Sequence, residues 1–284
     1  MRAVAFILAN APSCERIWKS AESAGHDILV IETDYKEQQS VIEEARRFSP
    51  DFMFLIAGVP EQHPGRLLTL DTMRILNSIA PLIHLCADAA NPDWHPAIAR
   101  WMDVFRLQVA MDGGDVPGCM STLQLMDERE FVPLPWNERD IRFGMSGSTS
   151  SGRRAEFTVA MQQRGLQLFK GSGPYADAAR IMCRFKIMFN HGMTTDAIDH
   201  CMCRITEAGY AGCALFENAE SPTYKFLTPD YEYFPYKTID DLDRLLQLPD
   251  DIIEASAQAL HSRVMRDYSP GPMWKNILKE AKVT

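Results

Sequence analysis

Two neighbouring segments determine how the second half of the chain folds. Residues 184–191 read RFKIMFNH, and residues 204–216 read RITEAGYAGCALF. The first contains an apolar run at 186–190 that is typical of a buried strand. The second begins as a helix, which we expect to end at Gly212, and continues into another apolar run at 213–216. A strand, a helix and a strand in this order predict a parallel βαβ unit.

The first 130 residues repeat this pattern. Short runs that are apolar on both faces alternate with amphipathic segments of helix length, as in parallel strands with crossover helices. We predict strands at 4–8, 28–31, 52–56, 82–85 and 107–110, and helices at 13–24, 36–48, 67–79 and 95–105. The N-terminal run could pass for a short signal peptide, but a helix and a second apolar run follow at once, which favours a first buried strand. This part of the chain is predicted to be a doubly wound α/β domain.

A segment with two prolines, 131–136 (FVPLPW), follows this series and is predicted to be a linker, because proline disfavours regular helix. A second series begins after it. We predict strands at 141–145, 166–169, 186–190 and 213–216, and helices at 154–164, at 175–183 and up to Ala211. Two α/β halves with a linker suggest a cleft between them, which a transferase and a binding protein would use equally well.

Composition limits the classes of function. The chain has 284 residues, enough for two domains, and a net charge of −9, which argues against a general affinity for nucleic acid or anionic membranes. No segment approaches the ~20 apolar residues of a transmembrane span. The seven cysteines show no zinc-site spacing and suit buried positions in a reducing compartment. We therefore expect a cytoplasmic protein that binds no nucleic acid and has no transmembrane segment.

Several nucleotide and nucleophile motifs are absent. The sequence contains no P-loop, no Gly-x-Gly-x-x-Gly after the first strand and no Gly-x-Ser-x-Gly elbow. These absences argue against the common NTPase, dinucleotide-binding and serine hydrolase classes.

In order and spacing, the two opening segments resemble the C-terminal domain of group 1 glycosyltransferases. The nearest branch is that of the spore-maturation CgeB-like transferases, whose pattern reads K-I-x-hydrophobic-N and, after a gap, R-x-x-E-A-x-x-x-G. The segment at 226–236 is similar to the next block of that family, and 274–281 lies where such proteins cross back onto their first domain. The resemblance covers about half the chain, from about 140 to 284.

The resemblance implies the GT-B fold, in which two Rossmann-like domains face each other across a cleft. The first domain binds the acceptor and the second binds a nucleotide-sugar. We accordingly expect an acceptor-side domain at 1–133, joined by a C-terminal helix at 265–284, and a nucleotide-sugar domain at 137–264.

The family also implies roles for two acidic residues in a Glu-x7-Glu pair. The second glutamate binds the ribose hydroxyls and maps to Glu207, and the first lies near the sugar and maps to Asp199, a shorter carboxylate. We assign Asp199 a catalytic role. It could equally be the N-cap of the helix that carries Glu207, a position that aspartate favours.

Cations and small-residue loops are the candidates for binding the donor's phosphates. We expect Lys186 and Arg204 to contact the diphosphate, because a site without a metal ion needs side-chain cations to neutralise the leaving group. The reaction is expected to need no metal or cofactor. Two loops could cradle phosphate or nucleotide, or simply turn the chain. Their candidate residues are Ser146, Gly147, Arg153, Gly171 and Gly173.

Three further residues lie at the ends of predicted strands. Asn190 ends the strand at 186–190 and His191 follows it, and both are candidates for substrate binding. Asp88 follows the fourth strand of the first domain, where it could act as an acceptor-side base or cap a loop.

Together these features predict a glycosyltransferase that moves a sugar from a nucleotide diphosphate-sugar to an unidentified acceptor, which could be a glycan, a protein or a small molecule. The resemblance implies that the anomeric configuration is retained. Two alternatives stay open: a sugar-nucleotide epimerase of the same fold, and a catalytically silent protein that binds a nucleotide-sugar.

Overall fold

The structure is a computed structural model that describes residues 1–8, 12–34, 36–56, 68–87, 89–146, 152–169, 175–191, 199–201 and 203–283; at 12, 13, 152 and 153 it describes the backbone alone. The chain forms two compact units. Unit 1 comprises Met1–Asp127 and Pro270–Thr284, and unit 2 comprises Glu128–Ser269. The boundary lies a few residues before the predicted linker, because the ring of Phe131 packs against those of Tyr175 and Tyr210 in unit 2, with centroids 5.8 and 5.6 Å away.

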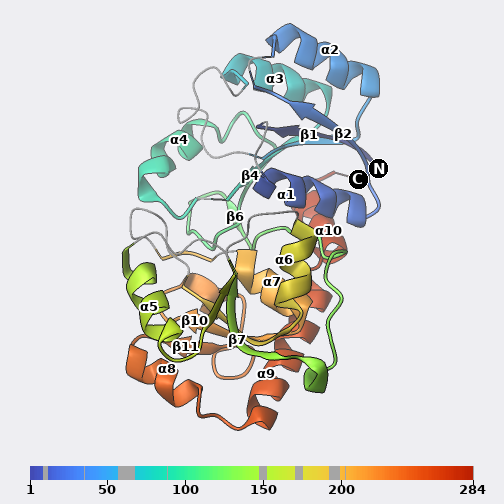
Figure 1. The fold of residues 1–284 in the computed structure, drawn as a ribbon. Helices are drawn as coiled ribbons and strands as arrows, with labels where there is room; N and C mark the ends of the chain where they lie inside the picture. The colour runs from blue at the N-terminus through green and yellow to red at the C-terminus, as the bar shows by residue number, and fades with distance from the viewer. Residues whose placement is uncertain are drawn as a thin grey trace. The chain divides into compact units, whose positions relative to one another are not determined.

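Unit 1 is built on a six-stranded parallel sheet with the strand order β2-β1-β3-β4-β5-β6. Helices α2 and α3 cover one face, and α1 and α10 cover the other (Figure 1). The strands are β1 (Arg2–Ile7), β2 (Asp27–Glu32), β3 (Phe52–Ile56), β4 (Leu82–Cys86), β5 (Leu107–Ala110) and β6 (Met120–Ser121). The helices are α1 (Pro12–Ser23), α2 (Gln38–Phe48), α3 (Leu70–Ile79), α4 (His95–Arg100) and α10 (Pro270–Glu280).

The five strands predicted for this part of the chain are confirmed. The N-terminal run forms β1, which pairs in parallel with β2 on one side and β3 on the other. The helix predicted at 95–105 is wrong in length, since α4 ends at Arg100. Beyond it the chain turns so that Trp101, Val104 and Phe105 are all buried in the core.

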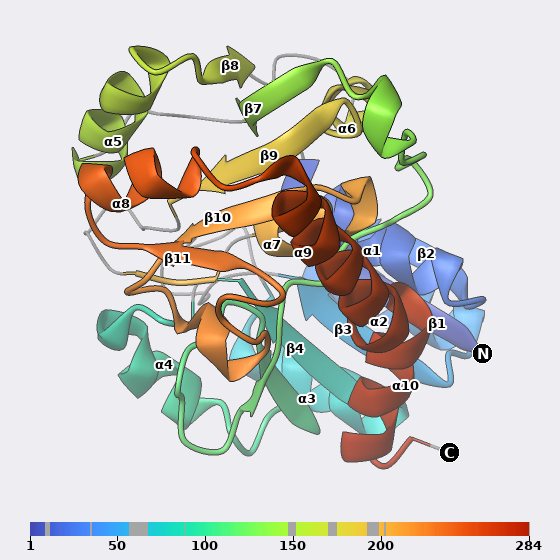
Figure 2. The same ribbon diagram turned by 90° about the horizontal axis from the view of Figure 1, so that it is seen from below.

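Unit 2 is built on a five-stranded parallel sheet with the order β11-β10-β9-β7-β8, drawn in Figure 2. The strands are β7 (Ile141–Ser146), β8 (Gln167–Phe169), β9 (Phe185–Asn190), β10 (Ala214–Asn218) and β11 (Phe234–Tyr236). The helices are α5 (Gly152–Gln162), α6 (Tyr175–Met182), α7 (Cys203–Ala211), α8 (Ile239–Leu245) and α9 (Asp250–Arg263), and α9 continues into a π-helical turn, η5 (Val264–Tyr268). The four predicted strands are confirmed; β11 was not predicted. Both units are doubly wound α/β domains, as expected.

The strand order of unit 2 creates a switch point. From β7 the chain moves to β8 on one side and then returns to β9 on the other side. Ligands of open α/β sheets bind beyond the carboxyl ends of the strands at such a point. In unit 2 these ends are Ser146 on β7 and Asn190 on β9.

The entry into unit 2 is fixed by Arg139. This buried guanidinium donates to the backbone carbonyls of Leu134 (3.0 Å), Phe185 (2.7 Å) and Ala211 (2.9 Å). It therefore joins the incoming chain to the start of β9 and the end of α7. Three carbonyl partners also satisfy a charge that would otherwise be costly to bury.

Helix α7 is deeply buried at Ile205–Ala211 and packs against α6, α9, η5, β9 and β10 of unit 2. Gly209 allows the closest approach: a Cβ at this position would lie 2.5 Å from Cγ2 of Val264 in η5. The carbonyl of Gly209 lies 2.8 Å from Nδ1 of His261, and the Tyr210 hydroxyl donates to the carbonyl of Tyr268 at 2.9 Å. Glycine is thus required here for packing.

We expect Gly209→Ala to destabilise the protein by about 1–3 kcal/mol, the usual cost of overpacking a core, despite the better helix propensity of alanine. Urea unfolding followed by circular dichroism measures this. The double variant Gly209→Ala/Val264→Ala should lose less stability than the sum of the two single changes. Gly271→Ala, where a Cβ meets nothing within 4 Å, serves as the control; equal effects at 209 and 271 would contradict the packing argument.

Candidate functional site

The carboxyl edge of the unit 2 sheet gathers buried polar side chains. Ser146, Asn190, Asn218 and Tyr236 end β7, β9, β10 and β11, and all four are buried. Parallel strands place these ends on one edge of the sheet, with the switch point between Ser146 and Asn190. A polar cluster at this position is the strongest candidate for a ligand site in unit 2.

His191 is held in one orientation at the end of β9. The Tyr236 hydroxyl donates to the carbonyl of Asn190 at 2.7 Å, and it lies 2.9 Å from Nδ1 of His191. Since the single hydroxyl proton goes to the carbonyl, Nδ1 must be the protonated nitrogen and donates to the tyrosine. Phe157 stacks on the imidazole with ring centroids 4.9 Å apart. The structure thus places His191 inside the protein as a fixed ring.

Two arginines flank the switch point, and both bind backbone carbonyls there. Nε of Arg204, on α7, donates to the carbonyl of Ser146 at 2.5 Å. Nε of Arg154, on α5, donates to the carbonyl of His191 at 2.8 Å. Burial lowers the pKa of Arg154, and the nearby charge of Arg204 lowers it further. Each guanidinium has five N–H donors, so this pair could also bind an anion.

Glu207 lies one turn after Arg204 on α7. Residues three apart share a helix face, so the cation and the carboxylate are neighbours. Glu207 is only 3% exposed, and its Oε1 accepts a hydrogen bond from the Tyr175 hydroxyl at 3.0 Å. A carboxylate has about four acceptor positions on its two oxygens, which is enough to bind this tyrosine and a pair of ligand hydroxyls.

Asp199 is bound by the end of β10. Asn218 donates from Nδ2 to Oδ1 of Asp199 at 2.5 Å. The neighbouring Glu217 is fully buried; its Oε2 accepts from Nδ2 of Asn190 at 2.6 Å, and its Oε1 accepts from the backbone N–H of Asn218 at 3.1 Å. The N-cap alternative for Asp199 is wrong, because α7 begins at Cys203, four residues after Asp199.

The structure does not bring Lys186 to this edge, which corrects the predicted diphosphate contact. Lys186 is the second residue of β9, four residues before Asn190, so the two lie roughly 13 Å apart along the strand. Its Nζ pairs with Oδ2 of Asp250 at 2.7 Å and lies 5.3 Å from the ring centroid of Trp136. The hydrogen bond from Lys186, with a further one from Arg142, lowers the pKa of Asp250. Lys186 is therefore a structural ion-pair residue at the amino end of the sheet.

Five predicted site residues lie outside the described part of the chain. These are Asp88, Gly147, Gly171 and Gly173, together with the side chain of Arg153. Within the described ranges, no group of three or more His, Cys, Asp or Glu side chains is arranged to hold a metal ion. In the same ranges, no helix has the length and apolar character needed to cross a membrane.

Tyr175, Glu217 and Asn218 are among the residues of this edge that the sequence analysis missed. The signal for the last two was present, because the otherwise apolar strand ALFEN ends in two polar residues. No local pattern marks Tyr175, whose contact with Glu207 joins residues 32 positions apart. Such a contact exists only after α6 and α7 have packed together.

Comparison with solved structures shows the fold. HepE from Anabaena, solved with UDP and glucose, matches with a TM-score of 0.65 at 10% identity, over 98% of this chain and 99% of that one. A glycosyltransferase from Rickettsia africae matches with a TM-score of 0.64 at 9% identity, over 99% and 97% of the two chains. An alpha-glucosyltransferase solved with UDP-glucose and DNA matches with a TM-score of 0.64 at 9% identity, over 98% and 99%. These matches confirm the GT-B fold with two Rossmann-like domains.

Comparison by sequence shows the family. A search among curated proteins gives no match. The family model described as Glycosyl transferase-like matches residues 129–279, which is more than half of the chain and includes both motif segments. The chain therefore belongs to the glycosyl transferase-like family and is a glycosyltransferase enzyme.

Proposed function

We propose that this enzyme transfers a sugar from a nucleotide diphosphate-sugar to an acceptor, and that the donor binds at the carboxyl edge of the unit 2 sheet. One observation carries the proposal: α7 presents Arg204 at the switch point and the buried carboxylate of Glu207 one turn away. A cation and a carboxylate at this spacing suit the diphosphate and the ribose of one donor molecule. The solved complexes of HepE with UDP and glucose support a UDP-sugar as the first donor to test.

In this proposal Glu207 binds the two ribose hydroxyls. A carboxylate accepts two hydroxyl hydrogen bonds side by side, one on each oxygen. Tyr175 holds Oε1 in place, and the burial of the carboxylate strengthens each hydrogen bond because water does not compete. The motif around Glu207 also supports the CgeB-like branch, which we propose as the nearest subgroup.

Arg204 and Arg154 would bind the diphosphate. Both are fixed through Nε to carbonyls at the ends of β7 and β9, so their positions are set before the ligand arrives. Like charges this close repel each other, and a bound anion offsets that repulsion. Charge-assisted bonds to two guanidiniums would also neutralise the leaving group without a metal ion. We propose that the reaction is metal-independent and needs no cofactor.

We further propose transfer with retention of the anomeric configuration. The bond from the anomeric carbon to the diphosphate oxygen breaks, and a bond to the acceptor oxygen forms on the same face of the sugar. The acceptor's proton passes to the departing diphosphate. Asp199 would stabilise the positive charge that develops on the sugar ring, and Asn218 positions its carboxylate.

We assign the acceptor to unit 1 and the reaction to the cytoplasm. All seven cysteines are free, which suits a reducing compartment. The net charge of −9 disfavours nucleic acid as a partner.

A thermal-shift panel of nucleoside diphosphates and their sugars on the full chain tests the donor assignment. The matching ligand at 100 times its Kd should stabilise the protein by about 2.7 kcal/mol. In Glu207→Gln the affinity should fall by about 1–3 kcal/mol, and the preference for ribose over 2′-deoxyribose should disappear. Glu254→Gln, on α9, is the matched control. Unchanged ribose preference in Glu207→Gln would show that this residue does not bind the ribose, and no stabilisation by any ligand would refute the proposal.

The diphosphate assignment is tested by comparing UDP with uridine in Arg204→Gln. We expect the affinity for UDP to fall roughly tenfold or more, the value of a lost charge-assisted hydrogen bond, while the affinity for uridine is preserved. Retained uridine binding also shows that the site is folded. Arg180→Gln, which changes an exposed arginine of α6, should leave both affinities unchanged. Equal losses for UDP and uridine in Arg204→Gln would contradict a contact with the phosphates.

The role of Asp199 is tested by separating turnover from binding. Asp199→Asn should slow hydrolysis of the donor roughly a hundredfold while leaving the Kd of the nucleotide diphosphate unchanged, because charge stabilisation acts in the transition state. Asp199→Glu restores the residue that the family carries here and should retain most of the rate. Donor hydrolysis unaffected by Asp199→Asn would exclude it from catalysis. Donor turnover without release of the sugar would instead indicate an epimerase.

A further inference from the structure

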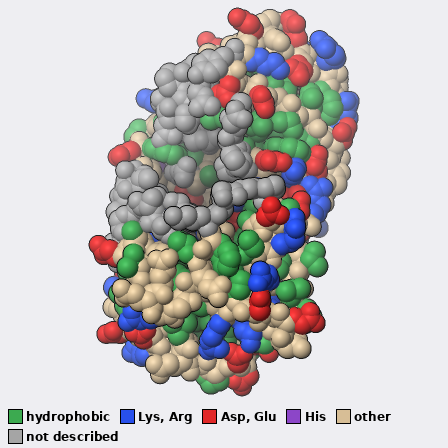
Figure 3. All heavy atoms as spheres, viewed as in Figure 1, with side chains coloured by type: hydrophobic (Ala, Val, Ile, Leu, Met, Phe, Trp, Pro, Cys, Tyr) green, Lys and Arg blue, Asp and Glu red, His purple; other side chains and the backbone are tan. Residues whose placement is uncertain are grey.

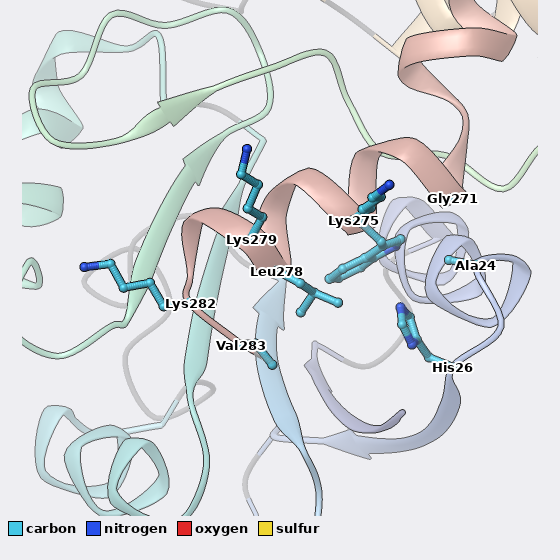
Figure 4. Close-up of a pocket in the computed structure, with 9 residues that line it drawn as sticks. Ala24, His26, Gly271, Lys275, Leu278, Lys279, Lys282 and Val283 are labelled. Carbon is cyan, nitrogen blue, oxygen red and sulfur yellow. The ribbon is translucent and has the colours of Figure 1, made fainter.

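The groove beside α10 in unit 1 does not gather side chains toward one ligand. Trp274, on its wall, is fully buried, and Leu278 is only 7% exposed. Lys275, Lys279 and Lys282 extend in different directions (Figure 4). Acidic and basic side chains are interspersed over the described part of the face drawn in Figure 3, so charge marks no partner surface there either. Buried polar side chains converge instead at the carboxyl edge of the unit 2 sheet.

One member of that edge is Glu217, a fully buried carboxylate on β10. It is the register partner of Asn190 on β9, so the two side chains are direct neighbours across the strands. Oε2 of Glu217 accepts from Nδ2 of Asn190 at 2.6 Å, and Oε1 accepts from the backbone N–H of Asn218 at 3.1 Å. One carboxylate therefore joins the ends of two neighbouring strands.

Asn218 connects Glu217 to Asp199. The backbone N–H of Glu220 donates to Oδ1 of Asn218 at 3.2 Å, which identifies the other end of this amide as the nitrogen. That nitrogen, Nδ2, donates to Oδ1 of Asp199 at 2.5 Å. A series of hydrogen bonds thus leads from the buried Glu217, through the backbone and side chain of Asn218, to the carboxylate that we assign to the sugar.

On its other side Glu217 adjoins the proposed diphosphate site. The carbonyl of His191, which follows Asn190, accepts from Nε of Arg154 at 2.8 Å. Burial and the charge of Arg204 lower the pKa of Arg154, and the negative charge of Glu217 acts in the opposite direction. A buried carboxylate is costly unless hydrogen bonds and a nearby counter-charge stabilise it, and Glu217 has both.

We propose that Glu217 is a positioning residue for the transfer reaction, which holds Asn218, and through it Asp199, in the orientation that the sugar requires. Glu217 is fully buried and its oxygens bind protein donors, so it acts through Asp199 and not by contact with the substrate. The inference rests on the proposed function, in which Asp199 stabilises the charge that develops on the sugar.

Two substitutions separate the hydrogen bonds of Glu217 from its charge. In Glu217→Gln the amide oxygen must face the backbone N–H of Asn218, which cannot turn, so the amide nitrogen faces Asn190. The side chain of Asn190 can turn its own amide over and accept from that nitrogen, so both hydrogen bonds are kept while the charge is lost. Glu217→Leu removes both acceptors at a similar side-chain volume.

The test uses the full chain and the nucleotide-sugar that stabilises the wild type most in the thermal-shift panel. We expect Glu217→Leu to slow hydrolysis of this donor roughly tenfold or more, the value of a lost hydrogen bond to a charged group, and Glu217→Gln to retain most of the rate. In both variants the nucleoside diphosphate should bind at least as tightly as in the wild type, because a negative charge near Arg154 is lost. Asn218→Ala, which removes the contact between Glu217 and Asp199, should slow hydrolysis as Glu217→Leu does.

A double-mutant cycle shows whether the effect passes through Asp199. Glu217→Leu should slow hydrolysis little further in the Asp199→Asn variant, but should have its full effect in Arg204→Gln. Ile253→Ala is the control for lost stability, because it removes part of a buried core side chain of α9. Below its unfolding temperature it should keep the wild-type rate.

The outcomes distinguish this inference from the proposed function. Equal losses of rate in Glu217→Gln and Glu217→Leu would assign the effect to charge and refute positioning by hydrogen bonds. Additive effects of Glu217→Leu and Asp199→Asn would refute it as well, as would an unchanged rate in Asn218→Ala. If Asp199→Asn itself leaves hydrolysis unchanged, the catalytic role of Asp199 fails, and if no nucleotide-sugar binds the wild type, the proposed function fails.

Discussion

The deep burial of α7 at Ile205–Ala211 is the constraint on which the candidate site depends. A helix buried in this way needs small residues at its contacts, and Ala208, Gly209 and Ala211 supply them. The close approach of Val264 to Gly209 fixes the depth and the rotation of the helix. Glu207 is consequently held inside the protein, where a carboxylate is stable only with hydrogen-bond partners. The same nine-residue helix therefore supplies both the small residues needed for packing and the polar residues of the candidate site.

The ends of the parallel strands supply the second half of the site. At the switch point, two arginines bind backbone carbonyls at these ends. Arg204 binds the carbonyl of Ser146, and Arg154 binds that of His191. A hydrogen bond to a charged group contributes roughly 1.5–3 kcal/mol, so these contacts stabilise the edge. They also concentrate positive charge there, which favours an anionic ligand.

Apolar runs predicted nearly all the strands of both sheets, because a strand that is buried on both faces appears in the sequence as a continuous apolar run. The helix predicted at 95–105 was too long. The spacing of apolar residues does not show that the chain turns after Arg100 and that Trp101, beyond the helix, is buried. Strand β11 is only three residues long, which is too short to be recognised as a strand from the sequence.

The sequence predicted the candidate site residues that lie together on one helix. It did not predict the contacts that form where several elements meet. Arg204 and Glu207 follow from a motif on α7. Lys186 belongs to the same motif as Asn190, but a strand places residues four apart at opposite ends of the sheet, and the motif alone does not show which end binds the ligand. Tyr175 acts through a partner distant in sequence, so no local pattern could reveal it. Glu217 and Asn218 did leave a local signal, the polar end of an otherwise apolar strand, although their partners are also distant in sequence.

Asp199 and Glu207, to which we assign catalysis and ribose binding, are positioned by different elements of unit 2. Aspartate is one methylene shorter than the family's glutamate, which keeps its carboxylate nearer the backbone. Asn218 binds that carboxylate at 2.5 Å, and Asn218 is in turn fixed by the contact of its backbone N–H with the buried Glu217. The orientation of Asp199 therefore derives from β10, whereas Glu207 is positioned by α7 and Tyr175. Because different elements hold the two acidic residues, a change at position 199 should alter the proposed sugar contact while leaving the proposed nucleotide contact intact.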